Sequence, residues 1–152
     1  MKKIKKGILA GTSGEYFVAA ELSRRGYIAS ITLKNTKGID ILVSNEEASK
    51  TVAIQVKTNS SERKAWVLNE KAEEYKGPAL YYVFVNLKNK VDVRPDFHIV
   101  PSEVVANYIK KEHDEWLLTP GKRGQPHKET PMRMFGDKDD AYLEKWEKLG
   151  LD

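Results

Sequence analysis

Two short stretches rich in Ile and Val place the strongest constraint on how this chain folds. Residues 39–43 and 52–57 are both typical of β-strands, and the polar residues between them are typical of a turn, so we predict a hairpin. Asp40 interrupts the first strand. Because side chains alternate along a strand, Gln55 and Lys57 share one face of the second strand, opposite its Val and Ile residues. The hairpin is therefore expected to bring Asp40, Gln55 and Lys57 together near one end of a sheet.

The composition is that of a globular chain. Of 152 residues, 40% are apolar and 32% are charged, which supports a hydrophobic core and argues against disorder. No apolar run approaches the roughly 20 residues of a transmembrane helix, so no membrane partner is expected. The lack of cysteine excludes disulfides, a thiolate nucleophile and a zinc–thiolate site, and we expect a cytoplasmic location. The net charge of +4 is compatible with a nucleic acid partner.

The patterning of the remaining chain predicts a mixed α/β (α+β) fold, in which a twisted sheet is covered by helices. The most apolar stretch, residues 79–85, is expected to be a central buried strand. A helix is predicted over 15–25, where Glu15 lies on the inward stripe and also complements the helix dipole. The other expected elements are a strand over 27–33, a turn over 35–38, a loop over 59–64, a short helix or irregular segment over 66–75, a strand over 96–100 and a helix over 102–111.

The composition changes in the last quarter of the chain. Residues 119–131 are rich in Gly and Pro and predict a loop, and residues 137–149 predict a terminal helix whose apolar stripe docks on the body. We therefore expect a core over 1–112 and an extension over 113–152 that packs on the same domain. The N-terminal lysines suit either a solvated arm or a phosphate contact; they are Lys2, Lys3, Lys5 and Lys6.

The polar residues that interrupt the strands suit phosphodiester hydrolysis. This reaction needs charge neutralisation at the phosphate and a source of hydroxide, and a divalent cation held by oxygen ligands supplies both. Asp40 is the expected anchoring ligand, and the Gln55 side-chain oxygen, the Val56 carbonyl and Glu15 would complete the site. Lys57 would face the scissile phosphate and stabilise the anionic transition state. The expected cofactor is Mg²⁺ or Mn²⁺.

A helix Glu followed by a strand Asp and a strand Gln-x-Lys resembles the PD-(D/E)XK nuclease superfamily. The sequence Ile-Gln-Val-Lys at 54–57 is most similar to its Mrr-type restriction endonuclease and Holliday-junction-resolvase-like branches, where Gln stands in the place of the usual acid. The resemblance covers residues 11–108, and it implies an α-β-β-β-α-β core and a metal-dependent DNA endonuclease. Members of this superfamily often work as dimers, because two strands must be cut, so the resemblance is compatible with a homodimer and leaves the oligomeric state open. The residues at the motif positions, and hence the expected catalytic residues, are Glu15, Asp40, Gln55 and Lys57.

Two departures from the motif leave a second reading open. The Pro that precedes the motif Asp is absent, and Gln55 is neutral where the usual residue is an acid. The alternative is a catalytically inactive nuclease-fold protein that binds nucleic acid or a protein partner. Asp40 and Lys57 also suit a purely structural ion pair. A third option is a small interaction protein whose working surface is the extension from His113.

The remaining candidates favour structural roles. His98, His113 and His127 lack the spacing of a metal cluster, and His98 is expected to be a hydrogen-bonded, half-buried strand residue. The basic loop at 121–124 suits a solvated turn better than a phosphate contact. The tryptophans are expected in the core or at docking surfaces rather than as platforms for bases.

Overall fold

The computed structural model describes residues 2–3, 6–33 and 37–152, so residues 35 and 36 of the predicted turn at 35–38 and Lys5 of the N-terminal arm lie outside the described residues. The order of elements confirms the predicted helix, three strands, connecting segment, two further strands and helix. No helix in the described ranges is long and apolar enough to cross a membrane. The elements are α1 (Ile8–Arg24), β1 (Ile28–Ile31), β2 (Ile41–Ser44), β3 (Thr51–Asn59), β4 (Ala65–Asn69), η1 (Glu70–Glu73), β5 (Leu80–Asn86), β6 (Asp96–Pro101), α2 (Ser102–Leu118), β7 (Met132–Gly136) and η2 (Trp146–Leu149).

Both long helices extend beyond their predicted limits. α1 begins at Ile8 and has no side-chain cap, so Gly14 lies inside the helix rather than in a capping loop. α2 continues to Leu118, seven residues beyond its predicted end, and His113 is buried one turn after Ile109. The expected division between residues 112 and 113 therefore falls inside α2.

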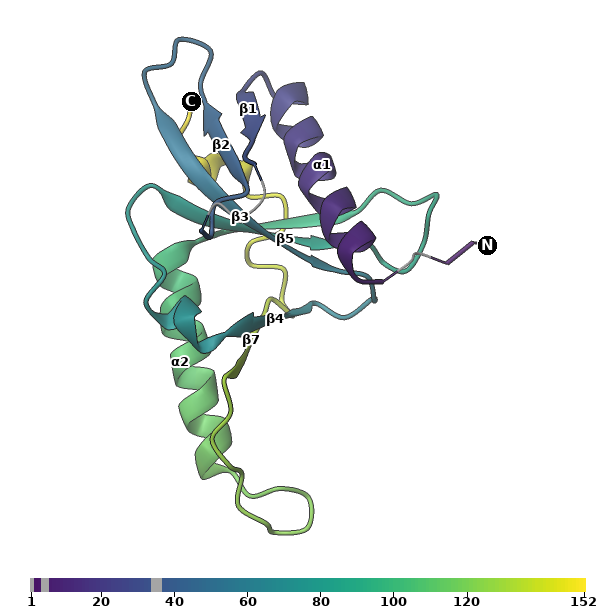
Figure 1. Cartoon of the computed structure of the whole chain (residues 1–152), viewed down its shortest axis with the longest axis vertical. Coiled ribbons are helices and arrows are strands. Elements are labelled where there is room, and N and C mark those ends of the chain that lie inside the picture. Colours follow the sequence, from purple (N-terminus) through teal and green to yellow (C-terminus); the bar gives the residue numbers. More distant parts are fainter. Residues whose placement is uncertain (1, 4–5, 34–36) are drawn as a thin grey trace.

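A five-stranded mixed sheet forms the centre of the fold, with the strand order β1-β2-β3-β5-β6. β3 and β5 are parallel, and the other neighbours are antiparallel. The predicted hairpin is formed by β2 and β3, with Ile41 opposite Ile54. In Figure 1, α1 lies along one side of the sheet, and α2 lies on the other side together with the two-stranded ribbon of β4 and β7.

Two hydrophobic cores lie on the two faces of the sheet, and β5 contributes to both. Val83 and Val85 belong to the core on the α1 side. Tyr82 and Phe84 alternate with them and belong to the core beneath α2 and the ribbon. A strand that is buried on both faces is apolar throughout. The prediction of a central strand at 79–85 is therefore confirmed.

The segment at 66–75 is not a short helix alone but forms β4 followed by the 3-10 helix η1. β4 pairs with β7 as an antiparallel ribbon. Trp66 and Leu68 are buried and their neighbours are not, which is the alternation of a strand with one covered face. β7 carries no clear signal in the sequence, because its buried Arg133, held by Glu73 at 2.9 Å, interrupts the apolar pattern.

The predicted terminal helix over 137–149 is wrong. Asp140 and Glu144 have φ angles of 55° and 56°, which a right-handed helix does not accommodate. The Asp137 carboxylate accepts hydrogen bonds from the backbone N–H groups of residues 141 and 142, so side-chain bonds replace helical ones. Only the short 3-10 helix η2 forms, and its two apolar side chains dock on the core on the α1 side.

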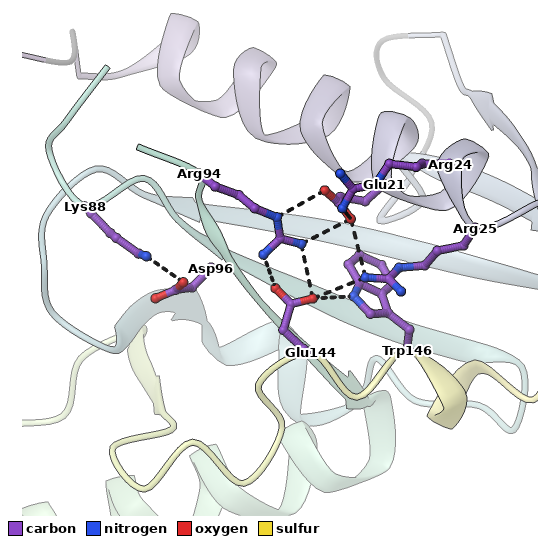
Figure 2. Close-up of polar contacts among 8 residues, drawn as sticks. All are labelled: Glu21, Arg24, Arg25, Lys88, Arg94, Asp96, Glu144 and Trp146. Atoms are coloured by element: carbon purple, nitrogen blue, oxygen red, sulfur yellow. Dashed lines mark hydrogen bonds and ion pairs between the residues drawn. The ribbon is translucent and has the colours of Figure 1, made fainter. Parts of the chain in front are cut away.

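Arg94 connects the C-terminal segment to α1 (Figure 2). Its guanidinium lies 2.5 Å from Glu144 and 3.1 Å from Glu21, and Arg25 lies 3.4 Å from each of these acids. The hydrogen bond to Glu144 raises the pKa of Arg94. Burial acts to raise the pKa of Glu144, but hydrogen bonds from Arg94 and Trp146 outweigh it, and the pKa is lowered. A charged network therefore ties the extension to the first helix.

Candidate active site

Asp40 lies just before β2, where the hairpin ladder with β3 stops. Its backbone N–H donates to the Ile54 oxygen at 2.8 Å, and the register of the hairpin puts Asp40 opposite Gln55. The carboxylate turns toward β3, and its Oδ2 accepts a hydrogen bond from the Val56 N–H at 2.7 Å. The carboxylate is thus fixed through Oδ2.

The Val56 carbonyl points toward the same edge as Asp40. Within one residue of an antiparallel strand, the N–H and the C=O point to the same side. Since the Val56 N–H is directed at Asp40, its carbonyl oxygen is directed past the end of β2 as well. A carboxylate, a backbone carbonyl and the nearby Gln55 amide form an oxygen-only donor set. Magnesium prefers this kind of donor set, so the residues present fit the predicted metal.

Gln55 and Lys57 project from the face of β3 that looks away from α1. Ile54 and Val56 are buried in the core on the α1 side, whereas the alternating Gln55 and Lys57 are partly exposed. Both line a cavity of about 400 Å³ beneath η1. Lys57 also lines a second hollow of about 350 Å³ on the side of Arg63. Asp40, Gln55 and Lys57 therefore lie near one end of the same face of the sheet. Asp40 and Lys57, which are both among the described residues, do not form the ion pair that the alternative reading expected.

Glu15 approaches from the other side of the sheet. It is half-buried on α1, and its neighbour Gly14 packs directly on Thr58 of β3. α1 covers the face opposite to Gln55 and Lys57, so Glu15 and these two residues belong to opposite sides of the sheet. The four predicted side chains thus come from two sides of the sheet rather than from a single face.

Tyr75 is a neighbour of the candidate site that no sequence pattern indicates. It follows η1, lines the same cavity as Gln55, and donates a hydrogen bond from its hydroxyl to the Gly38 oxygen. Burial, with a smaller contribution from the charge of Asp40, raises the pKa of Tyr75 to about 12. The hydroxyl therefore stays protonated at neutral pH and fixes the turn that leads into Asp40. Its placement depends on the ribbon packing beneath the sheet, which leaves no mark in local sequence.

A second group of potential metal ligands lies away from these residues. In the described ranges, His98, Asp137 and Asp140 offer ligand atoms within 4.8 Å of one another. Some of these atoms already serve the protein, whereas His98 Nε2 and Asp140 Oδ1 are buried and have no hydrogen-bond partner among the described residues. Asp137 accepts from His98 Nδ1 at 2.6 Å and from two backbone N–H groups, and Asp140 binds Lys64 at 2.6 Å. We interpret this group as a clasp that fastens the C-terminal segment to β6.

The histidines do not share a site, as their spacing predicts. His98 is fully buried rather than half-buried, and its ring packs at 5.1 Å from that of Trp66. His113 contacts Glu129 at 2.8 Å. His127 stacks on Trp116 with ring centroids 4.0 Å apart. The last two therefore order the loop after α2.

Comparison with solved structures identifies the fold. No family model matches the chain. No curated protein matches it in sequence. The bacterial homing endonuclease I-Ssp6803I is similar in structure, with a TM-score of 0.54 and 13% identity over 94% of this chain and 90% of that one. The Holliday junction resolvase Hjc of Archaeoglobus fulgidus is similar with a TM-score of 0.52 and 15% identity, over 93% and 97% of the two chains.

Both of these solved structures are nucleases. The fold of this chain is therefore the restriction-endonuclease-like fold of PD-(D/E)XK nucleases, which confirms the fold predicted from the sequence resemblance. At 13% and 15% identity the similarity establishes the fold alone, and the function has to be argued from the residues described above.

Proposed function

We propose that the protein is a metal-dependent endonuclease that hydrolyses DNA phosphodiester bonds. The observation that carries this proposal is the open edge of β3 next to Asp40. There one carboxylate oxygen is held by the Val56 N–H at 2.7 Å, the Val56 carbonyl is directed to the same edge, and the hairpin register puts Gln55 opposite Asp40. The nuclease fold of the two similar structures supports the same reading.

Each residue has a role in this proposal. Asp40, the Gln55 side-chain oxygen and the Val56 carbonyl would hold Mg²⁺ or Mn²⁺, with Glu15 reaching the edge from α1. The bound ion would supply a Lewis acid and a water of lowered pKa. Lys57 would place its ammonium against the scissile phosphate, where it neutralises charge that develops in the transition state.

The partner is proposed to be DNA. Arg63, Lys57, Lys71 and Lys37 line the two hollows on this face, which provides cations for a phosphate backbone. A homodimer would present two such sites to the two strands of a duplex. We propose a cytoplasmic location, where DNA and reduced conditions suit a chain without cysteine.

Cleavage of labelled DNA with Mg²⁺ or Mn²⁺ tests the proposal. Asp40→Asn and Lys57→Met should each lower the rate by at least about 100-fold. The matched controls are Asp139→Asn and Lys76→Met, which remove the same charges at exposed positions that line neither hollow. Circular dichroism should show that all four variants are folded. Unchanged cleavage by both site variants would refute the proposed site.

Neutral Gln55 favours one alternative, a protein of the same fold that binds DNA without cutting it. Titration calorimetry with Mn²⁺ separates the two functions. A nuclease should release heat of binding that disappears in Asp40→Asn, whereas a protein that only binds DNA should show the same heat in both.

A further inference from the structure

The cavity beneath η1 is lined by both apolar and positively charged side chains. Its volume is about 400 Å³, within the range of cavities that hold small organic ligands. Leu68, Ala72 and the ring of Tyr75 provide apolar surface. Three ammonium groups surround this surface, and they belong to Lys37, Lys57 and Lys71. A ligand that fits both parts carries a flat apolar ring and at least one phosphate.

The cavity continues the path of the second hollow. β4 runs beside both, since Ala65, Trp66 and Val67 line the hollow on the Arg63 side and the next two residues of β4 line the cavity. Lys57 lines both spaces and so lies where they adjoin. The two spaces form a path along β4, with Arg63 at one end, Lys37 and Lys71 at the other, and the candidate catalytic Lys57 between them.

We propose that the cavity beneath η1 binds one unpaired nucleotide of a DNA strand, with its phosphate between Lys57 and Lys71 and its base against Tyr75 and Ala72. The substrate class is thus DNA with a single-stranded segment beside the bond that is cut. This inference rests on the proposed function in taking Lys57 to face phosphate, and it adds a subsite that the metal residues do not supply.

The base must be unpaired for a geometric reason. The site is concave and is closed on one side by β4 and η1, and a base inside a duplex cannot leave its stack without being flipped out. A nucleotide in a single strand has no such cost. Stacking on one aromatic ring and contact with a cationic wall are the usual sources of affinity for single strands.

The test compares two fluorescent DNAs that share one duplex, one blunt and one with a five-nucleotide single-stranded tail. Binding is followed by anisotropy in EDTA, so that no strand is cut. The wild-type protein should bind the tailed DNA about tenfold more tightly than the blunt DNA. Lys71→Ala should remove most of this preference. Lys76→Ala is the matched control, because it removes the same charge from an exposed position outside the cavity.

A second variant blocks the cavity without changing charge. Ala72→Met should fill it and abolish the preference for the tail, while the affinity for blunt DNA stays within about twofold of wild type. A 2-aminopurine base in the tail should change its fluorescence on binding to the wild-type protein and not on binding to Ala72→Met. If Ala72→Met does not fold, Lys71→Ala with the same fluorescent base decides the question.

Three outcomes would overturn the inference. One is equal affinity of the wild-type protein for tailed and blunt DNA. Another is an unchanged preference in Lys71→Ala. The third is saturation by a free deoxynucleoside monophosphate together with no preference for the tail, which would assign the cavity to free nucleotides. Because binding is measured without cleavage, a retained tail preference in a protein that never cuts DNA would refute the proposed function and leave this inference standing.

Discussion

Gly14 of α1 lies directly against Thr58 of β3, so closely that a Cβ atom on Gly14 would be 1.9 Å from Thr58 Oγ1. That hydroxyl is buried and has no hydrogen-bond partner in the described part of the chain. The contact sets how near the helix lies to the strand, and Glu15 is the next residue along the helix. The approach of α1 to the candidate site therefore depends on the absence of a side chain at one position.

Gly14→Ala should destabilise the protein by about 1–3 kcal/mol, because the new methyl group overlaps Thr58 and the helix must move. The melting temperature would fall by about 2–4 °C for each kcal/mol. Gly11→Ala is the control, since a Cβ there meets nothing within 4 Å, and it should stabilise α1 by about 0.5–1 kcal/mol. Adding Thr58→Ala to Gly14→Ala should recover part of the loss. Equal melting temperatures for the two glycine variants would contradict this account.

Gln55→Glu should strengthen metal binding. A second carboxylate beside Asp40 adds negative charge to a site of oxygen donors, and a gain of about 1.4 kcal/mol corresponds to tenfold tighter binding. Calorimetric titration with Mn²⁺ measures the change. Gln125→Glu adds the same charge on the exposed loop after α2 and should leave the affinity unaltered. A weaker affinity in Gln55→Glu would argue against Gln55 as a ligand.

Asp137→Ala should lower the free energy of unfolding by about 2–4 kcal/mol, because it leaves the buried His98 and two backbone N–H groups without their acceptor. Urea unfolding measures this loss. Asp139→Ala, an exposed neighbour, should change the stability by less than about 0.5 kcal/mol. A loss in Asp137→Ala no larger than in the control would mean that the clasp contributes little.

Acid should weaken the network around Arg94. The pKa of Glu144 lies below its ordinary value of 4.5 in the folded protein, so its ionised form stabilises the fold above that pH. The stabilisation is lost as the pH falls from about 4.5 through the lower folded pKa. Glu144→Gln should therefore melt at a lower temperature than wild type at pH 7 and at a similar temperature in strong acid. Glu147→Gln, exposed in the same segment, should melt like wild type at both.

The strands around the candidate site follow from the sequence, because each has a strong local pattern. β2, β3 and β5 are short apolar runs. Burying a polar side chain in such a run costs free energy, so the polar residues beside them indicate a function. Alternation along β3 alone separates Gln55 and Lys57 from the buried valines. The register that places Asp40 opposite Gln55 then follows from the length of the hairpin connection.

The parts of the fold that the sequence does not predict depend on contacts between segments that are distant in the chain. β7 contains a buried Arg133 whose guanidinium is held by Glu73 and by the backbone oxygen of Thr130, and Glu73 and Arg133 do not indicate each other in the sequence. The turns after Asp137 replace a helix because one carboxylate caps backbone groups that a helical pattern would pair internally. The cavity beneath η1 has no local sequence signal for the same reason, since Tyr75 and Lys71 line it together with residues of the ribbon.

The pairing of β4 with β7 has a consequence for how the chain matures during synthesis. Asn69 pairs with Met132 and Ala65 with Gly136, so β4 forms the ribbon only with β7, a strand that is synthesised much later than β4. Until that strand emerges, the hydrophobic cluster around Trp66 and Leu68 lacks Phe135, and the hollow that Lys57 lines lacks Met134. The two hollows that Lys57 lines are therefore completed only after β7 has been made, well after the hairpin that carries Asp40.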